Sequence, residues 1–167
     1  MFNLFKKKEV FEPLNKDNSE ITSLGDGKLI PIESVSDPMF AEKMLGDSIA
    51  FQFSGRDVTV FSPVNGTLTV IFPTGHAFGV TTEDGVEVLV HIGIDTVNSK
   101  GEGFKILNKK QGDHVNAGDP IVTVNFNALQ EKYDMSTMLI ITNANGKNVT
   151  LVRDGDVTRE NVVGKIE

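Results

Sequence analysis

The most informative part of this chain is the stretch of residues 86–97, which reads VEVLVHIGIDTV. Its first half is an apolar run with the length and composition of a buried β-strand. The run leads to His91, which is followed closely by Gly93 and Asp95. Burying a strand that ends in an imidazole costs free energy unless the ring has partners or a task. We therefore expect His91 to be functional.

A second histidine, His76, begins the preceding strand-like segment, fifteen residues before His91. A turn centred on residues 83–84 sets the two histidines directly opposite one another, and a turn centred on residues 84–85 leaves them one diagonal step apart. Both registers place the imidazoles on one face of a hairpin, because residues two apart along a strand share a face. A loop of odd length would separate them.

In either register Phe78, Val80 and Leu89 would share the face of the two histidines and exclude water from it. Two neutral imidazoles on such a face can bind a metal, shuttle a proton, or combine a nucleophile with a neighbour that stabilises the transferred charge. They can also be structural histidines whose ring nitrogens bond to backbone carbonyls. The third histidine, His114, lies in a polar turn, where we expect it to be exposed and uninvolved.

A zinc hydrolase of the LytM type is one alternative, because Asp95 follows His91 with the H-x-x-x-D spacing of those peptidases. Those enzymes also need an H-x-H pair, which this sequence lacks, and a metal site needs three or four ligands. The sequence contains neither the Gly-x-Ser-x-Gly elbow of serine hydrolases nor a glycine-rich phosphate loop. We expect no metal and no cofactor.

Length and composition restrict the class of protein. The 167 residues suffice for one domain with a substantial core. With 16 Lys and Arg against 23 Asp and Glu, the chain lacks the basic surface that nucleic acid requires. The absence of cysteine excludes disulfides and thiolate sites. No apolar run could cross a bilayer, and no apolar region follows Lys6–Lys8 as in a secretory signal, so we expect a cytoplasmic protein.

The N-terminal residues differ from the rest of the chain. Phe2, Leu4 and Phe5 precede the lysines 6–8, a combination that can lie on an anionic membrane surface. We expect residues 1–19 to form a flexible arm, of which residues 1–16 make weak peripheral contact with a membrane, and residues 20–167 to form a single domain.

The domain is predicted to be nearly all β. Short runs rich in Val, Ile, Thr and Phe alternate with turn signals such as Asn65-Gly66 and Asp84-Gly85. The predicted strands are residues 29–32, 48–53, 58–61, 67–72, 77–82, 86–92, 121–126, 138–142 and 149–152. Two short helices are expected. One covers residues 39–45, with an Asp37-Pro38 cap before it and Gly46 after it, and the other covers residues 127–132.

Several segments together resemble the glucose-family enzyme IIA of the bacterial phosphoenolpyruvate-dependent sugar phosphotransferase system. They are residues 40–47 (FAEKMLGD), 62–67 (SPVNGT), 74–78 (TGHAF), 91–97 (HIGIDTV) and 100–104 (KGEGF). The resemblance spans about residues 20 to 165. It implies an antiparallel β-sandwich with Greek-key and jelly-roll connections and one or two short helices. It also implies a phosphotransferase component that works through a phosphohistidine intermediate.

The resemblance implies roles for individual residues. His91 matches the histidine that is phosphorylated, His76 matches its partner, and Thr74 matches the hydroxyl that orients the partner ring. A backbone carbonyl near Gly93 is the expected acceptor for the other ring nitrogen of His91.

Further residues are expected to bind partners. An apolar disc of Met39, Phe40, Phe72 and Val97 matches the family's partner-facing surface. Gly93 and Asp95 complete the predicted binding residues beside the acceptor histidine.

The same resemblance implies partners. The phosphocarrier protein HPr would donate the phosphoryl group, and a cysteine of a IIB domain would receive it during sugar uptake. The sequence contains no cysteine and no membrane span, so the IIB and IIC functions would belong to other chains. An alternative is a regulatory binding module that uses the same surface without the chemistry and contacts other protein targets. We expect a monomer.

Overall fold

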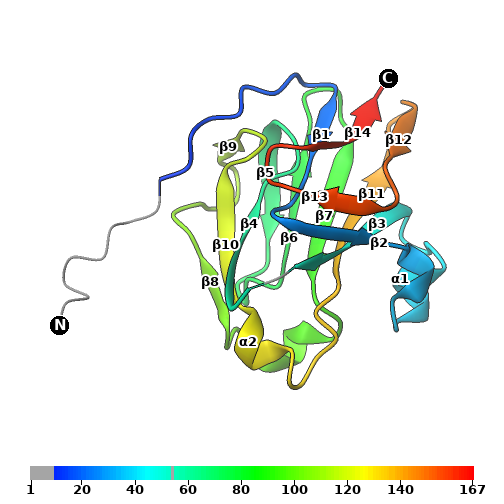
Figure 1. Cartoon of the computed structure of the whole chain (residues 1–167). Coiled ribbons are helices and arrows are strands. Elements are labelled where there is room, and N and C mark those ends of the chain that lie inside the picture. The colour runs from blue at the N-terminus through cyan, green and yellow to red at the C-terminus, as the bar shows by residue number, and fades with distance from the viewer. Residues whose placement is uncertain (1–9, 54) are drawn as a thin grey trace.

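The computed structural model of the chain describes residues 10–53 and 55–167 and consists mainly of antiparallel strands (Figure 1). The largest sheet has the strand order β13-β2-β3-β11-β7-β6-β5-β9, and two three-stranded sheets have the orders β4-β10-β8 and β1-β14-β12. The strands are β1 (Glu20–Thr22), β2 (Gly27–Ile30), β3 (Asp47–Phe53), β4 (Asp57–Phe61), β5 (Gly66–Ile71), β6 (Ala77–Thr81), β7 (Glu87–Ile92), β8 (Phe104–Ile106), β9 (His114–Val115), β10 (Pro120–Asn125), β11 (Thr137–Asn143), β12 (Val149–Leu151), β13 (Gly155–Val157) and β14 (Val162–Ile166). The predicted antiparallel sandwich is confirmed.

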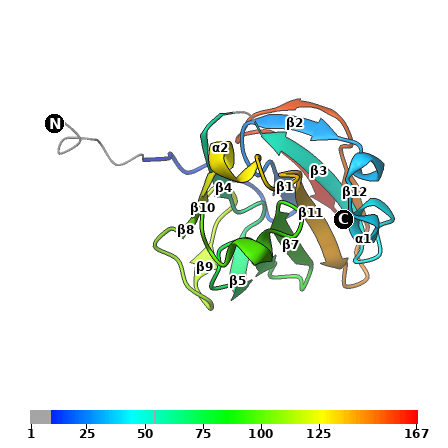
Figure 2. The same cartoon turned by 90° about the horizontal axis from the view of Figure 1, so that it is seen from below.

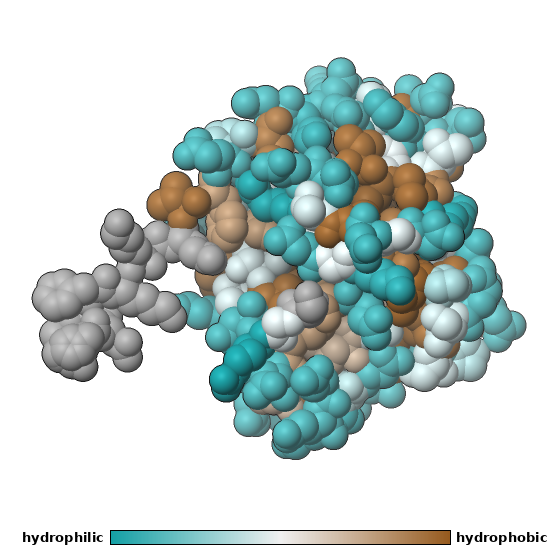
Figure 3. All heavy atoms as spheres, in the orientation of Figure 1, coloured by the Kyte–Doolittle hydropathy of each residue, from teal (hydrophilic) through white to brown (hydrophobic). Residues whose placement is uncertain are grey.

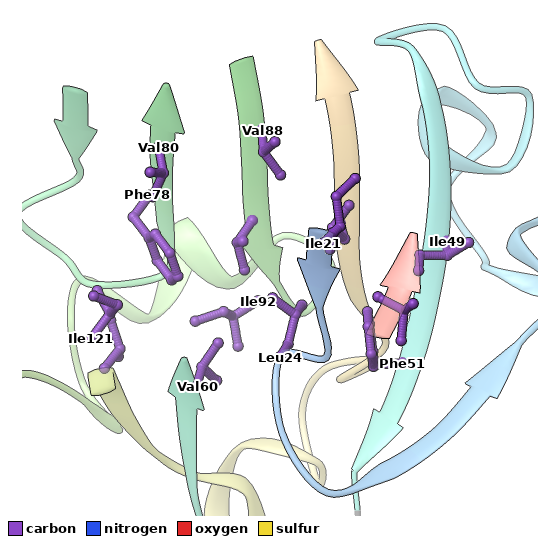
Figure 4. Packing of buried hydrophobic residues seen from close by; sticks show 14 of the residues in the cluster. Ile21, Leu24, Ile49, Phe51, Val60, Phe78, Val80, Val88, Ile92 and Ile121 are labelled. Carbon is purple, nitrogen blue, oxygen red and sulfur yellow. The ribbon is translucent and has the colours of Figure 1, made fainter. Parts of the chain in front are cut away.

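The main core lies between the large sheet and the two small ones. Phe51 and Phe78 reach it from the large sheet, Ile21 from β1, and Val60 and Ile121 from β4 and β10 (Figure 4). Figures 1 and 2 show the strands wrapped around this interior. On the face drawn in Figure 3 hydrophilic residues predominate, and apolar residues form small separate patches. Most of the Val, Ile and Phe residues in the predicted strands therefore lie in one buried core.

A second, smaller apolar cluster covers the other face of the large sheet. It joins Ala50, Met138 and Ile140 of the sheet to residues of the segment between β2 and β3 and to Ile94. That segment contains the 3-10 helix η2 (Ile32–Ser34) and the short helix α1 (Pro38–Ala41). The cluster thereby holds α1 beside the end of β7.

The two predicted helices are both shorter than expected. Asp37 caps α1 as predicted, with its side chain accepting a hydrogen bond from the Met39 amide. The helix ends at Ala41 rather than continuing to residue 45, because Lys43 adopts a left-handed conformation with φ of 57°. The other helix, α2, is Phe126–Leu129 instead of residues 127–132.

The hairpin of β6 and β7 has a register that differs from both predicted registers. Ala77 pairs with His91 and Thr81 pairs with Glu87, so five residues separate the last pair. Within this odd-length loop the Thr82 amide donates to the Val86 carbonyl, and the Thr82 hydroxyl accepts from the Val86 amide. These bonds close a loop that neither predicted turn would form.

The register corrects the predicted surroundings of the histidines. Phe78 and Val80 point into the main core instead of toward His91 (Figure 4). Leu89 shares the face of His91, as predicted, and packs against the smaller cluster. His76 precedes β6, so the alternation of the strand does not govern the direction of its side chain.

The predicted flexible arm contacts the domain at several places in its described part, residues 10–19. The ring of Phe11 meets the ring of Phe61 edge-on, with 4.8 Å between centroids. The guanidinium of Arg159 lies over both rings and donates to the Glu12 carbonyl. These contacts tie residues 11–12 to the domain, and the flexible arm of residues 1–19 stays a prediction, with residues 1–9 outside the described part of the chain.

Candidate functional site

His91 is the last but one residue of β7, in the middle of the large sheet, where it pairs with Ala77 of β6 and Met138 of β11. Its ring nitrogen Nδ1 lies 2.8 Å from the Gly93 carbonyl oxygen. A carbonyl can only accept, so Nδ1 carries the proton and Nε2 keeps its lone pair. The carbonyl acceptor is the one that the sequence analysis predicted.

Gly93 is required by the shape of the turn. Its φ is +78°, and a Cβ there would lie 2.5 Å from Cγ2 of Thr96 and 2.9 Å from the sulfur of Met135. The hydroxyl of Thr96, itself fully buried, donates to the Ile92 carbonyl at 2.5 Å. These contacts fix the backbone that bonds to the His91 ring.

His76 lies beside His91, as predicted, although the predicted registers were wrong. The ring centroids are 5.3 Å apart and the ring planes are inclined at 78°. The segment before β6 brings the ring there, and the Ile92 amide donates to the His76 carbonyl at 2.7 Å. The two imidazoles therefore meet at the open end of the hairpin, where His91 lies near the end of β7 and His76 immediately precedes β6.

Thr74 contacts His76 in the way that its predicted role requires. Its hydroxyl oxygen lies 2.6 Å from Nδ1 of His76. When the hydroxyl donates to Nδ1, the ring proton of His76 lies on Nε2. The Nε2–H group can then donate a hydrogen bond to an acceptor beside His91. His76 is 4% exposed, so this orientation is held by packing as well as by the hydrogen bond.

The surroundings of the two rings lower the pKa of both, so both rings are neutral at neutral pH. Burial lowers the pKa of His76 below its ordinary value of 6.5, and the neighbouring charge of protonated His91 lowers it further. Burial also lowers the pKa of His91, although the Gly93 carbonyl and the carboxylates of Asp37 and Asp95 act in the opposite direction. A neutral His91 has a lone pair available for attack.

The predicted apolar disc is exposed in part. Met39 is 40% exposed, Phe72 is 41% exposed and Val97 is 51% exposed. Phe40 is only 4% exposed, because it packs into the smaller cluster and its ring centroid lies 5.0 Å from that of His91. The expectation that Phe40 is exposed was wrong, and the ring supports His91 from below the surface.

Phe72 and the two acidic residues complete the surroundings of the pair. The ring of Phe72 meets His76 edge-on at 5.2 Å between centroids. Asp95 is exposed and adopts a left-handed φ of 59° at the start of the 3-10 helix η3 (Thr96–Ser99). Asp37 was predicted only as a helix cap, and its charge near His91 was missed because their proximity arises from packing of α1 against the sheet.

The remaining alternatives find little support at this site. Among residues 10–53 and 55–167, no group of three His, Cys, Asp or Glu side chains could hold a metal ion. The zinc-hydrolase alternative thus lacks a third ligand in that part of the chain. His114 is exposed on β9, as predicted, with Asn116 as its ring partner. The arrangement at His91 and His76 is instead suited to a nucleophile with an adjacent hydrogen-bond donor.

Comparison with protein families assigns residues 19–147 to one family model. Its description is "phosphoenolpyruvate-dependent sugar phosphotransferase system, EIIA 1". The match includes both histidines and the segment of α1.

Named relatives are similar over most of the chain. The glucose-specific EIIA component of Mycoplasma capricolum is 40% identical over 147 residues, which are 87% of this chain and 94% of that protein. The corresponding component of Halalkalibacterium halodurans is 45% identical over 119 residues, which are 71% of this chain and 67% of that protein. The glucose-specific EIICBA component of Streptococcus pneumoniae is 41% identical over 150 residues, and the chain covers only 20% of its length.

A solved structure has the same fold. The glucose permease IIA of Mycoplasma capricolum superposes with a TM-score of 0.81 at 39% identity, covering 89% of this chain and 96% of that one. At this identity and coverage the likeness extends from the fold to the family.

Proposed function

This chain belongs to the EIIA 1 family of the phosphoenolpyruvate-dependent sugar phosphotransferase system, and we propose that His91 is the residue on which it carries the phosphoryl group. The chain is a phosphocarrier component of that system. The observation that carries the residue assignment is the hydrogen bond from Nδ1 of His91 to the Gly93 carbonyl, which leaves Nε2 free beside His76.

In the proposed transfer, the lone pair of Nε2 attacks the phosphorus of phospho-HPr in line with the bond to its donor atom. A new nitrogen–phosphorus bond forms on His91, and the old bond breaks with its electron pair returning to HPr. The His91 ring gains positive charge, which the Gly93 carbonyl and the carboxylates of Asp37 and Asp95 stabilise. In the second transfer the thiolate of a IIB cysteine attacks the same phosphorus, so that a sulfur–phosphorus bond forms while the nitrogen–phosphorus bond breaks and its electron pair returns to Nε2 of His91.

His76 would assist this transfer without accepting the group itself. When Thr74 donates to Nδ1, the proton of His76 lies on Nε2, which can then donate to an oxygen of the phosphoryl group. Because both rings are fixed before the partner arrives, little reorganisation is needed during transfer.

The exposed apolar residues around the histidines are the proposed docking surface for HPr and for a IIB domain. Met39, Phe72 and Val97 are each at least 40% exposed, which is typical of apolar residues that a partner covers. Several relatives of this chain are named glucose-specific and one is named glucoside-specific, so glucose is the proposed sugar. A monomer in the cytoplasm is the proposed state of the protein.

Weak membrane contact through residues 1–16 also stays a proposal. It depends on the apolar residues and lysines of residues 2–8, outside the described part of the chain. No helix in the described residues is long and apolar enough to cross a membrane.

Labelling of the intact protein tests the residue assignment. Incubation with phosphoenolpyruvate, enzyme I and HPr should add one acid-labile, alkali-stable phosphoryl group, measured by intact mass. His91→Ala should abolish the label at a cost in stability of about 1 kcal/mol. His114→Ala is the matched control. His114 is exposed and lies on β9, which β6 and β5 separate from β7 in the large sheet. Full labelling of His91→Ala would show that another residue accepts the group.

A further inference from the structure

The turn that starts at the last residue of β7, residues 92–96, is held by hydrogen bonds from outside the β6–β7 hairpin. We name it the acceptor turn, because it contains the carbonyl that bonds to His91. The Gly93 amide donates to the Ser136 carbonyl at 3.1 Å, and the Ile94 amide donates to the Asp134 carbonyl at 2.8 Å. The position of the acceptor turn therefore depends on residues 134–136, which lead into β11.

The carboxylate of Asp134 fixes the conformation of residues 134–136. Its Oδ1 accepts from the amide of Ser136 at 3.0 Å and from the hydroxyl of Ser136 at 2.7 Å. Although partial burial raises the pKa of Asp134, these hydrogen bonds and those of Ser36 lower it by more, so the side chain is charged at neutral pH. A charged acceptor makes each of these bonds stronger than a bond between neutral groups.

The second oxygen of the same carboxylate reaches a different part of the chain. Oδ2 of Asp134 accepts from the hydroxyl of Ser36 at 2.9 Å, across 98 positions of sequence. Ser36 immediately precedes Asp37, whose side chain caps α1. That helix carries the exposed Met39 and the buried Phe40, whose ring supports His91.

We propose that Asp134 is a positioning residue that fixes the acceptor turn and the start of α1 relative to one another. It touches neither histidine, and it acts through Ser136 on the Gly93 carbonyl and through Ser36 on the docking residue Met39. The inference rests on the proposed function of His91 as the phosphoryl acceptor. Asp134 would then affect both the orientation of the His91 ring and the docking of partners at Met39.

The chain contains a matched control for the local part of this arrangement. Asp17 accepts from the amide and the hydroxyl of Ser19, both at 2.8 Å, in the same Asp-x-Ser pattern. Its carbonyl bonds to Glu20 instead of to the acceptor turn. Asp17→Ala therefore removes an equivalent turn without touching the support of His91.

The test compares Asp134→Ala, Ser36→Ala and Asp17→Ala by two measurements. Nitrogen NMR of the His91 ring reports which nitrogen carries the proton, and steady-state transfer from phospho-HPr gives kcat and KM. For Asp134→Ala we expect a larger fraction of His91 protonated on Nε2 and about a tenfold loss of kcat/KM, within the range that small misplacements cause. For Ser36→Ala we expect a raised KM with the His91 tautomer unchanged, and for Asp17→Ala no change in either.

Asp134→Asn separates geometry from charge. Its amide oxygen can still accept from Ser136, and its amino group can donate to the Ser36 hydroxyl, so it should restore the tautomer and most of kcat/KM. The proposal is overturned if Asp134→Ala and Asp17→Ala give the same tautomer and kinetics, or if Asp134→Asn is as impaired as Asp134→Ala. The ring tautomer is measured without any transfer, so it tests the positioning role even if His91 proves not to be the acceptor.

Discussion

At the scale of single residues, the two histidines of the site differ in their partners although both are neutral. His91 bonds to a backbone carbonyl, which fixes its proton on Nδ1, whereas His76 bonds to the Thr74 hydroxyl, which can donate or accept. The backbone contact presents a lone pair at one ring, and the hydroxyl permits a donor at the other. These different partners account for the separate roles proposed for the two rings.

The lowered pKa values of the histidines predict how stability depends on pH. In the unfolded chain both rings take up protons near their ordinary pKa of 6.5, whereas in the folded protein they do so only at lower pH. The unfolded state therefore binds more protons between those values, so stability falls as pH falls through that window and is unaffected above it. A double variant, His76→Gln with His91→Gln, should lose this part of the pH dependence.

Chemical denaturation at a series of pH values between about 7 and 5 measures the effect, since 6.5 is the ordinary histidine value. The slope of unfolding free energy against pH should be smaller in the double variant than in the wild type. His114→Gln provides the control, because that ring is exposed. Equal slopes in the wild type and the double variant would mean that folding does not lower the two pKa values.

At the scale of elements, the site is formed where β7 ends and the chain turns. The strand supplies His91, the acceptor turn supplies the carbonyl, and α1 supplies the ring of Phe40 behind it. None of these elements is long, and each is held by contacts to another, as the bonds from Gly93 and Ile94 to residues 134–136 show. The precision of the site thus comes from tertiary contacts more than from intrinsic helix stability.

Gly93→Ala is predicted to damage the acceptor turn. A positive φ alone costs a non-glycine residue about 1 kcal/mol. The new Cβ would in addition lie 2.5 Å from Cγ2 of Thr96, so the turn must shift and carry the carbonyl away from His91. We expect Gly93→Ala to lose more stability than the positive φ alone would cost. We also expect His91 to be phosphorylated more slowly in this variant.

Gly112→Ala is the control for this prediction. Gly112 has a similar φ of +97°, yet nothing lies within 4 Å of the position of its Cβ. Thermal unfolding and the rate of labelling by phospho-HPr, measured for both variants, separate strain from crowding. If Gly112→Ala is as unstable and as slow as Gly93→Ala, the crowding of the acceptor turn has no role.

At the scale of the whole molecule, the N-terminal segment and α1 lie on opposite sides of the sandwich in both views (Figures 1 and 2). The segment is attached by Arg159, whose guanidinium lies 5.1 Å from the centroid of Phe11 and 4.9 Å from that of Phe61. The same side chain donates to the carbonyls of Gly118 and Glu12. Arg159 therefore holds the start of the segment on the side away from the proposed docking surface, and Asn65 holds its later part by donating to the Lys16 carbonyl at 2.8 Å.

Arg159→Ala should release this segment while leaving transfer intact. The lost cation–π contacts and hydrogen bonds predict a destabilisation of about 1–3 kcal/mol. Hydrogen exchange over residues 10–19 should become faster, and labelling of His91 should keep its wild-type rate. Arg56→Ala, at an exposed side chain, is the control. Unchanged exchange in Arg159→Ala would mean that other contacts hold the segment, and slowed labelling would mean that the two sides are coupled.

Much of the fold could be predicted from sequence because its signals are local. Runs of Val, Ile and Phe beside turn residues such as Gly and Asp locate strands such as β3, β7 and β10 to within a residue or so. Short strands without such runs, among them β8, β9 and β13, have too few residues for a pattern and were missed. Their pairing comes from neighbours that are distant in sequence.

The sequence by itself determined the chemistry of the site, and the tertiary structure decided its arrangement. The identity of His91, its nearby glycine and the Thr74–His76 spacing are written in short segments, because hydrogen bonds over two residues depend mainly on local geometry. Short segments do not reveal three other features, which are the pairing of Ala77 with His91, the burial of Phe40 and the hydrogen bond between Asp134 and Ser36. Those features depend on how one loop closes and on how distant segments pack, and no local pattern carries that information.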